Sequence, residues 1–280
     1  MINDKAMIVL LNIRTWSARK YDREISKEIE AIHNSGDSGR YNKLLIERDA
    51  VNKIAKMATG TRCYHYANTL PWLDTGGRLL PATNYFNYMQ EIRRLKDEFE
   101  YEVSNFLDTY LDLKDESRDR LGDMYNEDDY PSQENLSAKY SFNTQIMPVP
   151  TAGDFRVNLN DEEVEVIKES IEEQLRKSTA MAMQDLWKRL FEVVQHMVER
   201  LSKKKNKFKD SLVSNIVALC DILPKLNVID DVDLNAAVSQ IKEKLTAYDP
   251  QTLRDNKEAR SETAIEAQKI LDKMKSYYVN

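Results

Sequence analysis

The chain has 280 residues, of which 31% are charged and 41% are hydrophobic, with only seven glycines and seven prolines. This composition favours a helix-rich soluble protein, because β-rich folds need more turn residues. A formal charge of −6 argues against a generally basic nucleic-acid-binding protein, although it leaves room for a local basic patch. At this length, one elongated domain and two compact domains are both open.

The two cysteines, Cys63 and Cys220, are far apart and show no CxxC spacing. They fit two reduced thiols in a cytosol-like compartment better than a disulfide framework. The only apolar run near the N-terminus, AMIVLLNI at residues 6–13, is shorter than the roughly 20 residues of a membrane span. No small-residue cleavage site follows it. We therefore expect a cytoplasmic protein with no targeting segment and no membrane partner.

In chain order, residues 1–32 mix extended and helical spacings of apolar side chains and favour neither element. Residues 33–43, HNSGDSGRYNK, concentrate the small polar residues that are typical of a turn. A helix is predicted from Leu44 onwards. It ends near Gly60, or continues through Ala67 if that glycine is tolerated inside it.

Residues 70–81, LPWLDTGGRLLP, place two adjacent glycines beside a tryptophan and two prolines. One interpretation is a phosphate-binding loop, in which backbone amides converge on an anion at a helix N-terminus. The segment lacks the spacing GxxxxGKS or GxxxxGKT and a preceding parallel strand, so we favour a tight turn. Asp74 and Gly76-Gly77 would reverse the chain, and the Trp72 ring would anchor the turn against the core.

Residues 85–113 give the clearest amphipathic helix. Apolar residues recur there at steps of three and four, which is the signature of one helical stripe. The stripe consists of Tyr88, Ile92, Leu95, Phe99, Val103, Phe106, Tyr110 and Leu113. An acidic loop, MYNEDDYPSQEN at residues 124–135, follows the helix, and Pro131 within it forbids simple helical continuation.

The apolar period changes at residues 140–146, where Tyr140, Phe142, Thr144 and Ile146 alternate with polar residues. A two-residue repeat is typical of a half-buried strand. The segment DFRVNL at residues 154–159 can pair back across the PVPTAG connector. We therefore predict a two-stranded hairpin inserted between helices, which needs a surface to pack on.

The longest helical signal covers residues 161–201. Apolar residues at steps of three and four form two series, Val164, Ile167, Ile171 and Leu175, and then Leu186, Leu190, Val193, Met197 and Leu201. Asn160 or Asp161 can cap the start, where the helix dipole favours the acidic residues of the first turn. An unbroken helix would be about 60 Å long, which implies an elongated molecule.

Three further helices are predicted towards the C-terminus. The first covers residues 208–223 and is stopped by Pro224, and the others cover residues 233–248 and 252–277. Asp249-Pro250 forms a turn between the last two, and Gln251 or Thr252 is the expected cap.

These elements predict a mainly α fold: an elongated bundle of six to seven helices, including one of about 40 residues, with a small inserted β-hairpin. We expect residues 1–280 to form one domain. Its blocks are the N-terminal helices with the LPW/GG loop (1–123), the acidic loop and hairpin (124–160), and the long helix with the C-terminal helices (161–280).

No catalytic or metal-binding pattern emerges. His33, Cys63 and His65 lack the HExxH or paired CxxC spacing of zinc sites, so partly buried histidines are the favoured interpretation. Asp128 and Asp129 lie in an acidic loop of the kind that is usually solvated. No GxSxG elbow is present, so we expect neither an enzyme nor a cofactor or metal.

Two features concern partners. The run SKKKNKFK at residues 202–209 holds five lysines that could contact phosphates, although lysines at a helix C-terminus also complement the dipole without any ligand. A methionine and aromatic stripe, Met181, Met183, Trp187, Phe191 and Met197, favours core packing over an interface. A rod of this length nevertheless leaves apolar stripes that partner helices can cover, as in a coiled coil.

Several stretches together resemble one family. They are LNIRTWSARK (11–20), SGRYNKLL (38–45), YHYANTLPW (64–72), RLLPATNY (78–85), MPVPTAGDFRV (147–157), DLWKRLFEVVQHMVERL (185–201) and YDPQTLR (248–254). The chain is thereby similar, over nearly its whole length, to a phage and mobile-element family catalogued as a domain of unknown function, number thirty-one fifty. The resemblance implies gene neighbours that encode a MoxR-type ring ATPase and recombination or single-strand-binding proteins. It supplies no active-site residues.

Two functional hypotheses follow. The first is a non-enzymatic phage-type interaction protein in the bacterial cytoplasm, which oligomerises or docks on a partner such as a MoxR-type AAA+ ATPase or a host factor. Its contacts would come from the long helices, the hairpin and four loop residues, Trp72, Arg78, Phe155 and Arg156. The alternative is a DNA-transaction accessory protein that binds nucleic acid through Lys203, Lys204, Lys205, Lys207 and Lys209.

Overall fold

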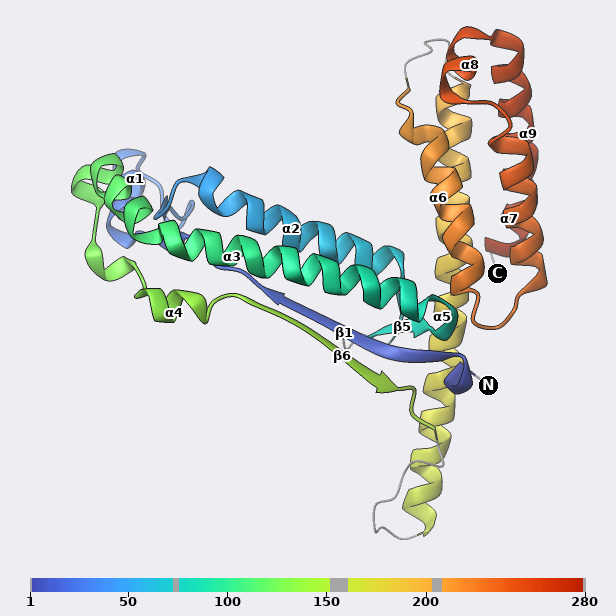
Figure 1. The fold of residues 1–280 in the computed structure, drawn as a ribbon, viewed down its shortest axis with the longest axis horizontal. Coiled ribbons are helices and arrows are strands. Elements are labelled where there is room, and N and C mark those ends of the chain that lie inside the picture. The colour runs from blue at the N-terminus through green and yellow to red at the C-terminus, as the bar shows by residue number, and fades with distance from the viewer. Residues whose placement is uncertain (1, 73–75, 152–160, 203–207, 279–280) are drawn as a thin grey trace. The chain divides into compact units, whose positions relative to one another are not determined.

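The structure is a computed structural model that describes residues 2–72, 76–151, 161–202 and 208–278 (Figure 1). Helices dominate these residues, as predicted, and a small antiparallel sheet accompanies them. Contacts divide the chain into two compact units. The first unit comprises Met1–Leu10, Tyr66–Tyr88 and Gln145–Asn280, and the second comprises Leu11–His65 and Met89–Thr144. These boundaries follow contacts in space and cut across the three blocks expected from the sequence.

The apolar N-terminal run forms strand β1 (Ala6–Arg14). It belongs to a sheet of strand order β4-β5-β1-β6, in which β4 is Leu70–Pro71, β5 is Arg78–Pro81 and β6 is Ser141–Pro148. In the antiparallel register of β1 and β5, Ile8 lies opposite Leu79, and both side chains are buried.

The LPW/GG segment is a tight reversal, as predicted. Strands β4 and β5 pair antiparallel, so the chain turns back on itself between them. Gly76 adopts a positive φ of 81°, which favours glycine, and a Cβ on Gly77 would lie 3.1 Å from Cγ2 of Ile8. Trp72 is only 4% exposed and belongs to the core of the first unit. Asp74 lies outside the described residues.

The predicted long helix is continuous: α5 (Asp161–Leu201) has 41 residues. Helices α6 (Ser211–Leu226), α7 (Val232–Leu245) and α9 (Lys257–Tyr278) pack with its C-terminal part into one hydrophobic core (Figure 1). The short helix α8 (Pro250–Asp255) precedes α9. From α5 the core takes Ala182, Met183, Leu186, Trp187, Leu190, Val194, Met197 and Leu201. The methionine and aromatic stripe is therefore mostly core, although Met181 is exposed.

Several predicted helix boundaries are wrong, and two of the errors have a clear local cause. Pro224 lies inside α6 and does not stop it, because a proline in the last turn removes only its own amide bond. The turn is held by burial of Leu223 and Leu226 and by Thr83, whose hydroxyl donates to the Lys225 carbonyl at 2.6 Å.

The cap of α8 is Asp249 and not Gln251 or Thr252. The Asp249 carboxylate accepts the backbone N–H groups of both residues, at 2.9 and 3.0 Å. Pro250 occupies the first helical turn, where its missing N–H costs nothing.

The second unit is built around α3 (Tyr85–Leu121), whose predicted stripe buries Phe99, Phe106 and Tyr110. Their rings pack with Trp16, Tyr140 and Phe142 at centroid separations of 5.7 to 6.4 Å. Helix α2 (Arg48–Ala67) continues through Gly60, which was the second of the two alternatives predicted for its end. The remaining elements of this unit are β2 (Arg19–Tyr21), α1 (Arg23–Ile32), β3 (Asn42–Leu44) and α4 (Gln133–Ser137).

Strand β6 confirms the extended segment predicted at residues 140–146. Its neighbour in the described sheet is β1. The second arm of the predicted hairpin, residues 154–159, lies outside the described residues, and so do the candidate contacts Phe155 and Arg156.

Candidate interaction surface

The N-terminal part of α5 carries an apolar stripe that the described residues cover only in part, although Leu175 at its end packs against the core of the first unit. None of the described residues 162–177 is buried, whereas Ser178 and Ala182, further along the same helix, are fully buried. Val164, Ile167, Ile171 and Leu175 are half-buried and lie along one face of the helix, because their spacing of three, four and four follows the helical period. We call these four residues the α5 stripe. A stripe of this width normally faces a core or a partner.

Charged residues flank the α5 stripe. Lys168 pairs with Glu165 at 3.5 Å, and Lys177 pairs with Glu173 at 2.6 Å, both within the helix. Such exposed pairs along a helix contribute little to stability, because solvent screens them. Their bonds are readily exchanged for bonds to another chain.

An apolar groove of about 850 Å³ opens beside the C-terminal end of the α5 stripe. Its lining comprises Ile2, Asn3, Thr151, Glu172, Leu175, Arg176, Thr179, Ala180, Met183 and Ile229. All of these residues belong to the first unit. Glu172 and Arg176 form no ion pair with any described residue, and both are exposed at the rim of the groove. An apolar floor with one acid and one base at its edge suits a protein segment better than a small polar substrate.

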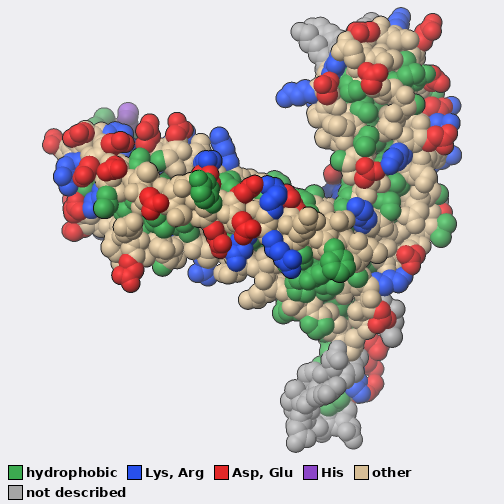
Figure 2. All heavy atoms as spheres, in the orientation of Figure 1, with side chains coloured by type: hydrophobic (Ala, Val, Ile, Leu, Met, Phe, Trp, Pro, Cys, Tyr) green, Lys and Arg blue, Asp and Glu red, His purple; other side chains and the backbone are tan. Residues whose placement is uncertain are grey.

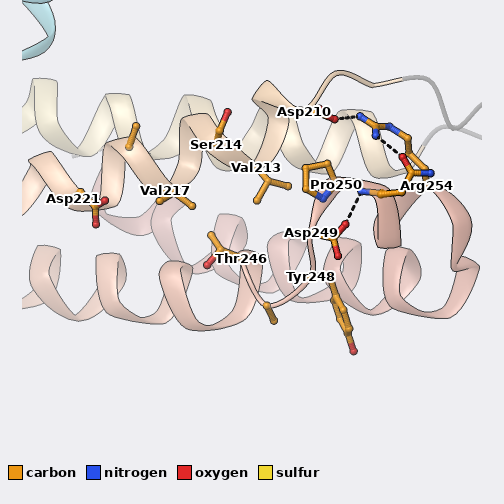
Figure 3. A pocket seen from close by; sticks show the side chains of 13 residues that line it. Asp210, Val213, Ser214, Val217, Asp221, Thr246, Tyr248, Asp249, Pro250 and Arg254 are labelled. Atoms are coloured by element: carbon orange, nitrogen blue, oxygen red, sulfur yellow. Dashed lines mark hydrogen bonds and ion pairs between the residues drawn. The ribbon is translucent and has the colours of Figure 1, made fainter.

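A second groove lies where α6 meets the turn between α7 and α8 (Figure 3). It contains three aspartates and an arginine, but each has a partner. Arg254 pairs with Asp210 and donates to the Phe208 carbonyl at 3.1 Å. Asp221 pairs with Lys242 at 2.6 Å, and Asp249 caps α8. Charged groups engaged in this way hold the elements together and are not poised for proton transfer or nucleophilic attack.

The second unit contains a buried lysine. The Lys43 side chain is only 7% exposed, and its ammonium lies 2.8 Å from Asp129 and 3.4 Å from Asp22, and donates to the Met124 carbonyl at 2.9 Å. Burial alone would lower the pKa of Lys43, but the two carboxylates outweigh it and keep the pKa above its ordinary value. Lys43 is therefore a permanent cation with all three N–H donors used, which suits a structural role. Asp129, which belongs to the acidic loop, is therefore paired with Lys43.

The two predicted loop contacts that the structure describes, Arg78 and Trp72, are both engaged within their own unit. The Arg78 guanidinium donates to the Thr69 hydroxyl at 2.7 Å and carbonyl at 3.0 Å and lies over the Tyr66 ring, 4.8 Å from its centroid. Arg78 therefore braces the end of α2, and burial lowers its pKa. Trp72, being buried in the core, presents little surface to a partner.

Of the five lysines in the run, the structure describes Lys209, which is exposed. Lys203, Lys204, Lys205 and Lys207 lie outside the described residues. On the face shown in Figure 2, acidic and basic side chains of the described residues are interspersed.

The histidine and cysteine candidates do not converge. No cluster of three or more His, Cys, Asp or Glu side chains suited to a metal ion occurs among the described residues. His65 is buried in α2, whereas Cys63 is exposed on the same helix, and Cys63 and Cys220 are both free thiols.

Within the described part of the chain, no helix has both the length and the apolar character needed to cross a membrane. Comparison with models of known protein families, with curated proteins and with solved structures finds no match to this chain.

Proposed function

We propose that this protein is a non-enzymatic interaction protein that docks on a partner through the N-terminal part of α5 and the adjacent groove. The observation that carries the proposal is the α5 stripe: four apolar residues in register on a continuous helix, with no buried residue among the described positions 162–177. Leaving such a stripe in water forfeits about 25 cal/mol for each Å² of apolar surface that a partner would cover.

The pairing of charged residues inside the protein also supports the proposal. Arg254, Lys43 and their carboxylate neighbours are engaged in ion pairs that join elements. Polar groups used in this way favour a scaffold over a reactive centre.

The sequence resemblance suggests the setting and one class of partner. A phage-type protein of the bacterial cytoplasm whose genes neighbour a MoxR-type ring ATPase would dock on that ATPase or on a host factor. This suggestion rests on association alone.

An affinity comparison tests the proposal. The full chain, the double variant Ile167→Glu with Ile171→Glu, and the matched control Val166→Glu serve as baits for purified MoxR-type ATPase and for cell extract. Val166 is 58% exposed and lies across the helix from the stripe, so its substitution adds a negative charge outside the surface, one where the double variant adds two. We expect the double variant to lose partners that the control keeps. Identical retention by all three baits contradicts the proposal.

The second candidate function is a DNA-transaction accessory protein that binds phosphates through the lysine run. The observation in its favour is the exposed Lys209 just before α6, although the next residue, Asp210, is an acid that pairs with Arg254. Retention of DNA should then fall steeply with salt and should be lost when Lys203, Lys204, Lys205, Lys207 and Lys209 are changed to Glu. Unchanged retention removes this candidate.

A further inference from the structure

Helix α1 carries three isoleucines on one face, and the described residues bury none of them. The helix lies at the end of the second unit at which α3 terminates (Figure 1). We propose that α1 binds a basic amphipathic helix of a partner protein, through these isoleucines and an acidic hollow beside them. The α5 stripe belongs to the first unit, so this surface goes beyond the docking function proposed for α5 and does not depend on it.

The three residues Ile25, Ile29 and Ile32 form what we call the α1 stripe. Their steps of four and three place the side chains on one face of the helix. Ile29 is 41% exposed and Ile32 is 67% exposed, whereas Ser26 is the one residue of α1 that is buried. Every residue of the second unit is described, so no other part of that unit covers the α1 stripe.

The exposed end of the α1 stripe lies away from the point at which the helix is anchored. The Asp22 carboxylate accepts the Ile25 backbone N–H at 3.1 Å, and the Ser26 hydroxyl accepts the Tyr41 backbone N–H at 2.9 Å. Both bonds are in the first turn. Isolated helices shorter than roughly 12–15 residues are marginal in water, so a helix of 10 residues depends on packing of its apolar face. A partner that covers the exposed isoleucines would supply this packing to the rest of α1.

The flank of the α1 stripe is acidic. Glu28 lies beside the stripe, because it follows the first isoleucine by three residues and precedes the last by four. Glu24 lies one turn before Glu28, and neither carboxylate forms an ion pair with a described residue. Lys27 lies on the face opposite the stripe. Like charges four residues apart on a helix repel each other, and a cation from a partner would relieve that repulsion.

A hollow of about 520 Å³ continues the α1 stripe on the side of the acidic loop, and Ile25 lines it. Tyr21 and Tyr125 add aromatic rings to its wall. Carboxylates outnumber cations in its lining, and two of them, Glu24 and Asp123, form no ion pair with a described residue. The charged residues of the lining are Asp22, Glu24, Asp123, Asp129, Arg23 and Lys43. A lysine or arginine of a partner fits this hollow, with its apolar stem along the rings and its charge at the unpaired carboxylates.

These two features together specify the occupant. An amphipathic helix places apolar side chains on the α1 stripe, and lysines or arginines beside its own apolar face reach the acidic flank and the hollow. An anionic membrane surface is disfavoured, since Glu24 and Glu28 would meet lipid head groups of the same sign.

Binding of a model helix tests the proposal. The probe is a synthetic peptide of leucines and lysines patterned as an amphipathic helix of about four turns, and its leucine and glutamate counterpart is the charge control. We expect the full chain to bind the Leu/Lys peptide, and Ile29→Ser with Ile32→Ser to weaken binding about tenfold. The matched control, Val232→Ser with Ile265→Ser, also removes two exposed apolar side chains, from the first unit, and should bind like wild type.

A second pair of variants tests the acidic flank. Glu24→Gln with Glu28→Gln should weaken binding of the Leu/Lys peptide and make the affinity less sensitive to salt. Glu199→Gln with Glu258→Gln removes two exposed acids of the first unit and should change neither quantity. Equal affinity of all variants, or equally tight binding of the Leu/Glu peptide, overturns the proposal.

Vesicles of phosphatidylcholine and phosphatidylserine distinguish a lipid surface from a protein partner. We expect no co-sedimentation of the wild-type chain with these vesicles. Co-sedimentation that is lost in Ile29→Ser with Ile32→Ser would assign the α1 stripe to a membrane and overturn the basic helix as its occupant.

Discussion

At the scale of single residues, the most consequential charge is Lys43. Its ammonium joins Asp22, at the start of α1, to Asp129, in the acidic loop, and almost no solvent reaches it. We expect Lys43→Met to lower the free energy of unfolding by about 3 kcal/mol, because it removes the one buried cation that faces both carboxylates. Urea unfolding followed by circular dichroism measures this loss.

The matched control is Lys20→Met. Lys20 also faces Asp129, at 3.6 Å, but it is 54% exposed. A pair with that much solvent contributes at most about 1 kcal/mol and often nothing, so the control should unfold much like the wild type. Equal losses of unfolding free energy in the two variants would show that burial of Lys43 does not contribute to stability.

The carboxylate of Asp22 makes stability depend on pH. It accepts the Ile25 backbone N–H at 3.1 Å and faces Lys43, and both interactions hold its pKa below the ordinary value of 3.8. A lowered pKa contributes stability that is present above the ordinary value and is lost as the pH falls through the folded value. Asp22→Asn keeps the capping oxygen but removes the charge.

We therefore expect wild type to be more stable than Asp22→Asn at neutral pH, with the difference vanishing in acid below pH 3.8. Denaturant unfolding of both proteins across this range measures the difference. A gap that is constant, or that widens as the pH falls, contradicts the assignment.

Two glycines should respond to alanine with opposite signs. Gly60 lies inside α2 with open space around it, so Gly60→Ala should stabilise by about 0.5–1 kcal/mol through helix propensity. Gly76 has a φ of 81°, so Gly76→Ala should destabilise by about 1–2 kcal/mol. Unfolding free energies of both variants against wild type decide the matter, and effects of the same sign would contradict the backbone argument.

At the scale of elements, the two halves of α5 should differ in what they contribute to folding. Ile167→Glu with Ile171→Glu changes two half-buried positions outside the core and should alter the unfolding free energy of the monomer by less than about 1 kcal/mol. Leu186→Ala empties a fully buried position and should cost about 3 kcal/mol. Urea unfolding in dilute solution compares the free energies of unfolding of these two variants. If the stripe variant costs as much as Leu186→Ala, the stripe is interior core and not a docking surface.

Long helices could be predicted from the sequence because their apolar residues repeat with the helical period over many turns. The stripes of α3 and α5 illustrate this, and the boundaries of α5 match the expected 161–201. Short elements lack that redundancy. β1 is a short continuous apolar run, which periodicity alone does not separate from a buried helix, so the sequence favoured neither element there.

The errors have local causes. Pro224 marks a helix end by propensity, but burial of Leu223 and Leu226 carries α6 past it. The pairing of β1 with β5 joins residues about 70 positions apart, such as Ile8 and Leu79, and no single-sequence pattern specifies such a partner.

At the scale of the whole molecule, the surface residues expected from amino-acid type were less predictable than the fold. Aromatic and arginine residues are favoured anchors, yet Trp72 is core and Arg78 braces Thr69. The α5 stripe was recognised as a helical stripe, but which part of it the fold would leave accessible depends on how α6, α7 and α9 pack. That information lies in tertiary contacts and not in the spacing of α5 itself.

If a second copy of the chain occupies the proposed docking surface, the α5 stripe determines the oligomeric state of the whole molecule. Sedimentation equilibrium of wild type, Ile171→Glu and Val166→Glu over a range of concentrations measures it directly. We expect wild type and Val166→Glu to reach twice the mass of one chain, and Ile171→Glu to remain at the mass of one chain. Wild type and Ile171→Glu with the same mass at every concentration would contradict self-association through α5.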